Sequence, residues 1–259
     1  MNKTVTFFAS GLFLALVSGC GSGGGSDPGA TYPITTSNLR AIQTGDQLAY
    51  AVSYDGAFFD GSGEVSIRGE LTENFSRGEG LAYGDNEKPG FNLLTRTSIL
   101  QADGQNVTAI TSFAQDMQMN FIRLSDDEDE DCFVPESEFD AGRAPLVLPG
   151  TFSVGFVSDI QVSMVCENGD SLVHRYRVSV VRNETVSVPA GRFDSFVSGY
   201  SLASQRSNSF GFLVESHEES GLVWVNPEFG IVKSVGSSQT GPTTFNAEFS
   251  SELISFDLQ

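Results

Sequence analysis

Short apolar runs alternate with polar residues along most of the chain, and glycine, asparagine, aspartate and proline separate them. In the run that ends at the Asp55-Gly56 turn, the apolar positions are Leu48, Tyr50, Val52 and Tyr54. Alternation of this kind is typical of a strand with one buried face. Similar patterns predict further strands at 64–71, 91–100, 106–113, 118–124, 151–157, 160–166, 172–188, 193–201, 210–216, 222–225, 231–235 and 244–256.

No window beyond residue 39 shows a sustained helical period. The pattern therefore predicts an all-β fold, in which an antiparallel meander forms a sandwich or a partly closed barrel with little helix. A single domain over residues 38–259 is expected, because this length suits one large β domain.

Two hairpins are predicted from their turn residues. In the first, Pro189 presets φ and Gly191 supplies a positive φ after a strand that ends at Val188. In the second, Asn226-Pro227 begins the turn and Gly230 leads into the returning strand.

The first nineteen residues differ from the rest, because Lys3 precedes an apolar stretch from Val5 to Val17 that is too short for a transmembrane helix. The small residues Ser18 and Gly19 then stand directly before Cys20. Residues 17–20 thereby resemble the lipobox of bacterial lipoproteins.

This resemblance implies a signal peptide at 1–19 and an acylated Cys20 that anchors the chain in a membrane. Glycine rather than aspartate at position 21 favours the outer membrane, with the domain facing the periplasm or the cell surface. A secretory signal peptide without lipidation is the alternative. Residues 20–37 are expected to form a tether, since 21–29 are rich in glycine and serine.

Thirty-three acidic residues against fourteen basic ones give a net charge of −19, which disfavours nucleic acid as a partner. The aromatic residues are mostly phenylalanine, with 21 copies beside one tryptophan, which favours core packing over a sugar-stacking platform. No phosphate-binding loop or dinucleotide fingerprint is found, and no cofactor is expected.

Cys132 and Cys166 remain as a pair once Cys20 is assigned to lipid. A disulfide is expected between them in an oxidising compartment, and it would stabilise the fold by about 3–4 kcal/mol. Two free thiols are the alternative. A metal site is less favoured, because neither cysteine has another cysteine or a histidine near it in sequence.

An acidic segment precedes Cys132, and its carboxylates suit Ca²⁺. The candidate ligands are Asp126, Asp127, Asp129 and Asp131. The glycine that an EF-hand loop needs at its sixth position is missing, so a solvated acidic loop with at most weak cation binding is the preferred interpretation.

The two histidines limit any catalytic proposal. His174 falls on the apolar face of a predicted strand and is expected to be partly buried and hydrogen-bonded. His217 lies in a polar stretch, 215–221, that is interpreted as an exposed turn. Residues 199–203 match a nucleophile elbow only in part. A hydrolase is therefore a minority hypothesis.

Four segments together resemble a broad group of bacterial envelope proteins of unknown function. They are residues 45–50, 148–152, 188–194 and 224–233. The resemblance implies an antiparallel β fold over residues 39–258, related in some members to lipoprotein carriers that hold acyl chains in a half-barrel. It brings no catalytic residues, and the lid helices of the carriers are missing from this sequence.

The expected function is that of a membrane-anchored envelope lipoprotein that acts as a non-catalytic binding or structural module. Its partners would be the membrane, through the lipid, and another envelope protein. The alternatives are a carrier or sensor of an apolar ligand and, second, a hydrolase.

Overall fold

The computed structural model describes residues 36–58, 63–77, 91–116, 121–126, 132–133, 146–166, 168–241 and 245–259. Every regular element in these ranges is a strand, which confirms the expected all-β fold. No helix there is long and apolar enough to cross a bilayer. The strands are β1 (Thr36–Asn38), β2 (Gln47–Phe58), β3 (Glu64–Arg77), β4 (Phe91–Ala102), β5 (Gln105–Asp116), β6 (Phe121–Asp126), β7 (Cys132–Phe133), β8 (Leu146–Leu148), β9 (Thr151–Ser153), β10 (Val157–Cys166), β11 (Ser171–Val188), β12 (Gly191–Ser207), β13 (Leu213–Asn226), β14 (Gly230–Gly241) and β15 (Phe245–Asp257).

Thirteen of these strands form one sheet, in the order β7-β10-β11-β12-β13-β14-β15-β2-β3-β4-β5-β6-β8, and β1 pairs separately with β9. All the pairings are antiparallel. The pairing of β15 with β2 joins the last strand of the chain to the first long one. The meander is therefore continuous from β10 through β15 and from β2 through β6.

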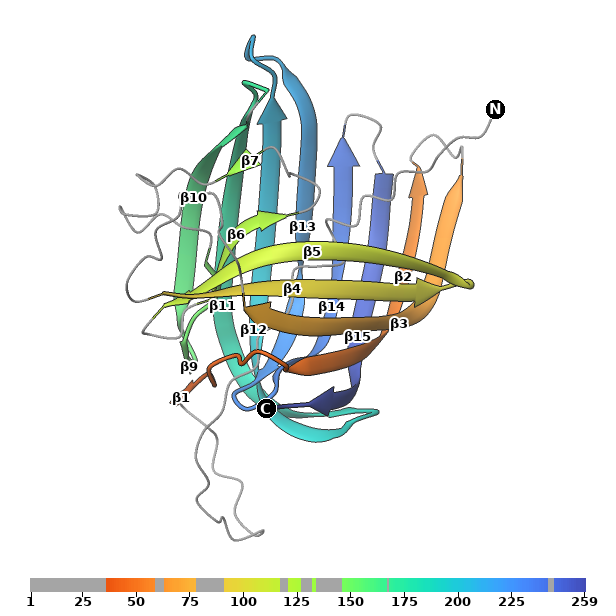
Figure 1. Cartoon of the computed structure of the whole chain (residues 1–259), viewed down its shortest axis with the longest axis vertical. Coiled ribbons are helices and arrows are strands. Elements are labelled where there is room, and N and C mark those ends of the chain that lie inside the picture. The colour runs from red at the N-terminus through yellow and green to blue at the C-terminus, as the bar shows by residue number, and fades with distance from the viewer. Residues whose placement is uncertain are drawn as a thin grey trace, which may run out of the picture.

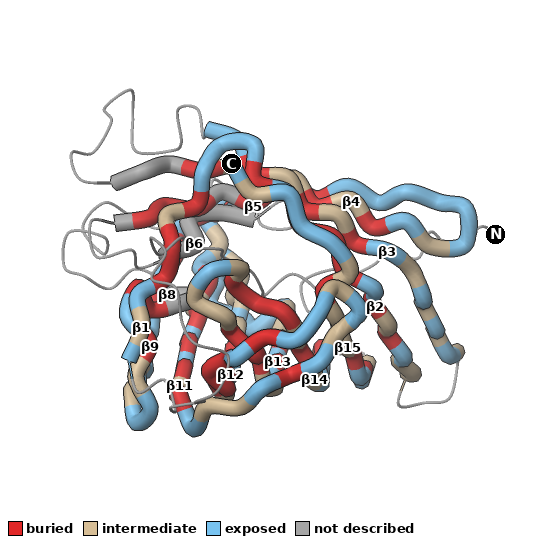
Figure 2. Tube along the Cα trace, turned by 90° about the horizontal axis from the view of Figure 1, so that it is seen from below, coloured by how far each residue is buried: buried red, intermediate tan, exposed pale blue. Residues whose placement is uncertain are grey.

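The sheet folds back over itself, so that β3, β4 and β5 cross in front of β11 to β14 (Figure 1). Viewed from below, the two parts form two layers, and buried positions alternate with exposed ones along the strands (Figure 2). The far end of the sheet returns to its beginning, because β8 contacts β11 without pairing with it. The result is a partly closed barrel.

Large side chains fill the space between the layers. Tyr50 of β2, Phe152 of β9 and Phe196 of β12 are fully buried, and the rings of Phe152 and Phe196 lie 5.7 Å apart. Each side chain of this kind stabilises the fold by about 1.5–3 kcal/mol through removal of apolar surface from water. These contacts hold the crossing strands against the long ones.

Glycines let aromatic rings lie directly on the inner face of the sheet. Gly221 and Gly236 are register neighbours on β13 and β14, and a Cβ on either would lie close to the side chain of Tyr200. A Cβ at Gly236 would also lie 2.6 Å from Cζ of Phe249. A larger residue at either position would therefore displace both the packed side chains and the backbone of the neighbouring strand.

A buried ion pair closes one end of the molecule. Arg40 Nη1 and Nη2 donate to the two carboxylate oxygens of Asp46 at 3.0 and 2.9 Å, and both side chains are fully buried. Asp46 also accepts hydrogen bonds from the backbone N–H groups of Gln43 and Gln259. The segment between β1 and β2 is thereby tied to the last residue of the chain.

The two predicted hairpins are confirmed, with turns between Val188 and Gly191 and between Asn226 and Gly230. The predicted turn at 215–221 is wrong, because β13 runs unbroken from Leu213 to Asn226. The predicted strand at 210–216 is wrong in its first residues, which form the turn between β12 and β13. In the first case the pairing of β13 with strands on either side outweighs the local sequence pattern, and in the second the hydrogen bonds of Asn208 to Phe210 and Phe212 close a turn.

Candidate functional site

The disulfide expected between Cys132 and Cys166 is present, and it joins two residues that are paired in register between β7 and β10. Cys20 lies outside the described residues, as do Asp127, Asp129 and Asp131, while Asp126 ends β6. Within the described part of the chain, no group of three or more histidine, cysteine, aspartate or glutamate residues is arranged for a metal ion. The lipidation and calcium hypotheses therefore stay predictions.

Both histidines lie in one row across the sheet. His174 of β11 and His217 of β13 are each register partners of Ser204 on β12. Ser204 Oγ lies 2.5 Å from Nδ1 of His174, and His174 is buried, as expected. His217 is also buried, with Nδ1 3.0 Å from Oγ1 of Thr240, so the prediction of an exposed role for it is wrong.

A buried carboxylate lies beside this row. Tyr200 donates a hydrogen bond from its hydroxyl to Glu219 at 2.7 Å, and His217 Nε2 lies 3.7 Å from the other carboxylate oxygen of Glu219. Burial, together with the nearby Glu219, raises the pKa of Tyr200. The hydroxyl therefore stays protonated and remains a donor. The cluster is a polar network inside the core, and the side chains of Tyr200, His217 and Glu219 are all buried.

A second buried pair lies between the layers. Glu73 of β3 and Arg96 of β4 approach to 3.2 Å with almost no solvent exposure. The Arg96 guanidinium lies 4.9 Å from the ring centre of Phe113. Burial raises the pKa of Glu73 to about 8, although the charge of Arg96 acts in the opposite direction.

The strongest candidate for a binding site is the outer surface of the same strands, which we call the open face. It consists of two register rows of mostly exposed side chains that cross seven strands from β11 to β3. The first row is Arg177, Ser201, Ser220, Ser237, Glu248, Asp55 and Ser66. The second row is Arg175, Ala203, Glu218, Gln239, Asn246, Ala57 and Glu64.

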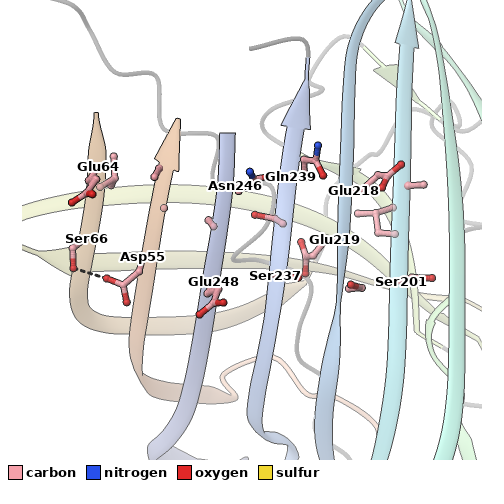
Figure 3. A pocket seen from close by; sticks show the side chains of 18 of the residues that line it. Asp55, Glu64, Ser66, Ser201, Glu218, Glu219, Ser237, Gln239, Asn246 and Glu248 are labelled. Carbon is pink, nitrogen blue, oxygen red and sulfur yellow. Dashed lines mark hydrogen bonds between the residues drawn. The ribbon is translucent and has the colours of Figure 1, made fainter. Parts of the chain in front are cut away.

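The open face lies on the side of the sheet away from β4 and β5 (Figures 1 and 3). All members of the two rows except Arg177 line a shallow pocket of about 910 Å³. Small side chains form its floor near the middle, including Ser201, Ser220 and Ser237. Their size explains the hollow, because longer side chains stand on both sides of them (Figure 3).

The charges of the open face are unevenly distributed. Glu64, Glu218 and Glu248 are exposed and form no ion pair with another described residue. Asp55 binds Arg68 at 2.6 Å, and this hydrogen bond lowers the pKa of Asp55. The other end of the face is different, because Arg175 there is paired with Asp159.

This arrangement suits binding. The floor offers hydroxyl and amide groups, and the carboxylates of Glu64, Glu218 and Glu248 are spread from β13 to β3 without an ion pair to another described residue. The partial nucleophile elbow at 199–203 lies within the unbroken strand β12, whereas an elbow needs a sharp strand-to-helix turn. Its Ser201 is an exposed residue on the floor of the pocket.

Sequence reasoning did not find the open face. Serine, glutamine and glutamate at alternate positions indicate only that one side of a strand faces water. The pairing register of seven strands is needed to bring these residues into two rows, and no local signal specifies that register.

No protein-family model and no curated protein matches the sequence. Among solved structures, a Bacteroides fragilis protein assigned as exported, with a YmcC-like fold, is 14% identical; the match covers 85% of this chain and 99% of that chain, with a TM-score of 0.38. A Parabacteroides distasonis protein assigned as a lipoprotein is 11% identical, with coverage of 83% and 96% and a TM-score of 0.42. Scores this low do not define the fold family of the chain or its function.

Proposed function

We propose that the chain is a non-catalytic lipoprotein of the bacterial outer membrane, anchored through Cys20, whose open face binds a basic segment of another envelope protein. The observation that carries the binding proposal is the pair of polar rows around the 910 Å³ hollow. The lipobox resemblance at residues 17–20 supports the anchor, and several acyl chains would make it stable.

The charge of the open face supports a cationic partner. Glu64, Glu218 and Glu248 bring negative charge to the rows from β13 to β3 and form no ion pair with another described residue. Oppositely charged surfaces steer association and favour the correct partner. The net charge of −19 for the whole chain acts in the same direction.

The dimensions of the rows support an extended partner. Seven neighbouring strands span about 29 Å, because strands in a sheet lie about 4.8 Å apart. An extended peptide rises about 3.3 Å per residue, so about nine residues would cross the face. The small serine side chains on the floor leave room for its backbone.

The alternative of an apolar carrier would need free space between the layers. Core side chains such as Tyr50, Phe152 and Phe196 occupy the described part of that space. The hydrolase alternative with a histidine as base would need a histidine in an open site, and neither His174 nor His217 lines the hollow on the open face. Binding by the open face is therefore the preferred function.

The test is the binding of a fluorescent nine-residue lysine peptide to the purified full chain, followed by fluorescence anisotropy. The double variant Glu218→Lys/Glu248→Lys should weaken binding about tenfold or more, because two carboxylates become repulsive. The control Glu70→Lys/Glu228→Lys changes the same number of exposed glutamates away from the rows and should change binding less than about twofold.

Equal losses in the two double variants would refute a role of the open face, and so would the absence of binding by the wild-type chain. A photo-crosslinking residue at Ser237 should then capture a partner in intact cells, while the same residue at Glu70 should not. The anchor is tested separately by mass spectrometry of the N-terminal peptide. A peptide that begins at an unmodified Cys20 would refute lipidation.

A further inference from the structure

The turn between β12 and β13 exposes an unusual group of apolar side chains, which we call the apolar tip. Its members are Phe210, Phe212, Leu213 and Val214, with exposed fractions of 84%, 70%, 60% and 43%. The turn forms one end of the long axis of the molecule, beyond the neighbouring hairpins (Figure 1). Exposed side chains of this size need an explanation when several lie together.

Part of the backbone of the apolar tip is hydrogen-bonded within the turn. Asn208 Oδ1 accepts hydrogen bonds from the N–H groups of Phe210 and Phe212 at 3.1 and 3.0 Å. The Asn208 N–H donates to the carbonyl of Phe212 at 2.9 Å, and the Gly211 N–H donates to the carbonyl of Asn208 at 2.7 Å. A segment that enters a bilayer must satisfy its backbone groups in this way, because lipid offers no partners.

The apolar tip carries no charge. Residues 207–214 include none of the 47 charged residues of the chain. The nearest on one side is Arg206, which is already paired with Asp170 at 3.0 Å. This composition contrasts with the acidic open face, so the two surfaces suit different partners.

We propose that the apolar tip inserts into the headgroup and upper acyl region of a lipid bilayer, namely the membrane in which Cys20 is anchored. The inference rests on the proposed anchor and adds a second membrane contact. A protruding tip fits a bilayer without a matching pocket, and phenylalanine and leucine side chains are typical of interfacial insertion. Zwitterionic lipid is the appropriate surface, since the net charge of −19 repels anionic headgroups.

The tether is long enough for both contacts. From Cys20 to Thr36 the extended chain reaches at most about 55 Å. The distance from Thr36 to the tip can be followed along paired strands. Strand β1 pairs with β9, and the turn after β9 is hydrogen-bonded to Val180 of β11. At the other end of β11, Ser171 is paired with Ser207 just below the tip. The nine residue-to-residue steps from Val180 to Ser171 span about 30 Å, and the turn adds about 10 Å. One bilayer can therefore hold the lipid and the apolar tip.

The test uses the full chain, purified from bacterial membranes and reconstituted into vesicles of phosphatidylethanolamine and phosphatidylcholine with brominated acyl chains. The variant Phe210→Trp should show tryptophan quenching about threefold stronger than the control Val157→Trp. Val157 is also an exposed apolar residue, but it lies on β10 far from the tip. The native Trp224 is buried and gives the same background in both variants.

Equal quenching of the two variants overturns the proposal, whether both signals are strong, weak or absent. A tip that instead docks on a protein also gives equal signals, because these vesicles contain no other protein. A second measurement uses protein without the lipid, so that only the tip can hold it on the vesicles. The double variant Phe210→Ser/Phe212→Ser should lower the amount of this protein that floats with the vesicles about tenfold, and an unchanged amount contradicts insertion. If Cys20 proves unmodified but Phe210→Trp is still quenched more strongly than Val157→Trp, the anchor is refuted and insertion of the tip is supported.

Discussion

The buried ion pair between Arg40 and Asp46 offers the sharpest test of how the fold is held together. The substitution Asp46→Asn keeps the size of the side chain and removes its charge. In the wild type, the carboxylate accepts two hydrogen bonds from Arg40 and one each from the backbone of Gln43 and Gln259. In the variant, an amide NH₂ group must face at least one of these donors, and the guanidinium loses its counterion.

The expected cost is large because both side chains are fully buried. An uncompensated buried charge costs about 3–5 kcal/mol. For a domain of this size each kcal/mol shifts the melting temperature by about 2–4 °C, so the variant should melt about 6–20 °C lower. Asp257→Asn is the matched control on an exposed aspartate and should change the free energy of unfolding by less than about 0.5 kcal/mol.

Urea denaturation of the full chain at pH 7, followed by circular dichroism, measures this difference. The double variant Arg40→Met/Asp46→Asn should be less destabilised than the sum of the two single variants, because it no longer buries a lone charge. A loss below about 1 kcal/mol for Asp46→Asn would refute the reasoning, and so would strict additivity in the double variant.

Three further predictions concern the core. Burial raises the pKa of Glu73 to about 8 from 4.5, so the folded protein keeps a proton that the unfolded chain releases. The free energy of unfolding should therefore fall as the pH rises from about 5 to 8. Urea titrations should show a flatter dependence on pH for Glu73→Gln but not for the exposed control Glu70→Gln. Gly236→Ala should cost about 1–3 kcal/mol in thermal unfolding, because its Cβ would lie 2.7 Å from a backbone oxygen; an unchanged melting temperature would contradict this close approach. Tyr200→Phe removes the hydrogen bond to the Glu219 carboxylate and should lower the free energy of unfolding in urea by about 1–3 kcal/mol. An unchanged free energy of unfolding would contradict a stabilising role of that bond.

The sequence predicts the strands best where apolar alternation and turn residues agree. The run from Leu48 to Tyr54 falls within β2, and the turn residues Pro189 and Gly191 mark the β11–β12 hairpin. These signals are local, because a turn needs particular φ values and a half-buried strand needs alternation. The fold class could therefore be predicted without knowledge of which strands pair.

Neither the open face nor the buried polar cluster of Tyr200, His217 and Glu219 could be predicted, since their parts meet only through long-range pairing. In β13, the inward residues His217 and Glu219 are polar, so the alternation that marks a strand is absent there. Their partners Thr240 and Tyr200 come from the two neighbouring strands. A polar residue that finds a buried partner elsewhere in the chain resembles an exposed residue when only the local sequence is considered.

The open face and the apolar tip share strands β12 and β13 but lie at different heights along them. Ala203, the open-face residue nearest the tip on β12, is four residues below Ser207, so about 13 Å of strand separates the hollow from the start of the turn. Insertion of the tip would orient β12 and β13 at a steep angle to the bilayer plane. The open face would then point along the membrane surface, where a partner can reach it. Because the two surfaces share no residue and lie further apart than about 10 Å, substitutions in one should leave binding by the other unchanged. Loss of lysine-peptide binding in Phe210→Ser/Phe212→Ser would contradict this separation.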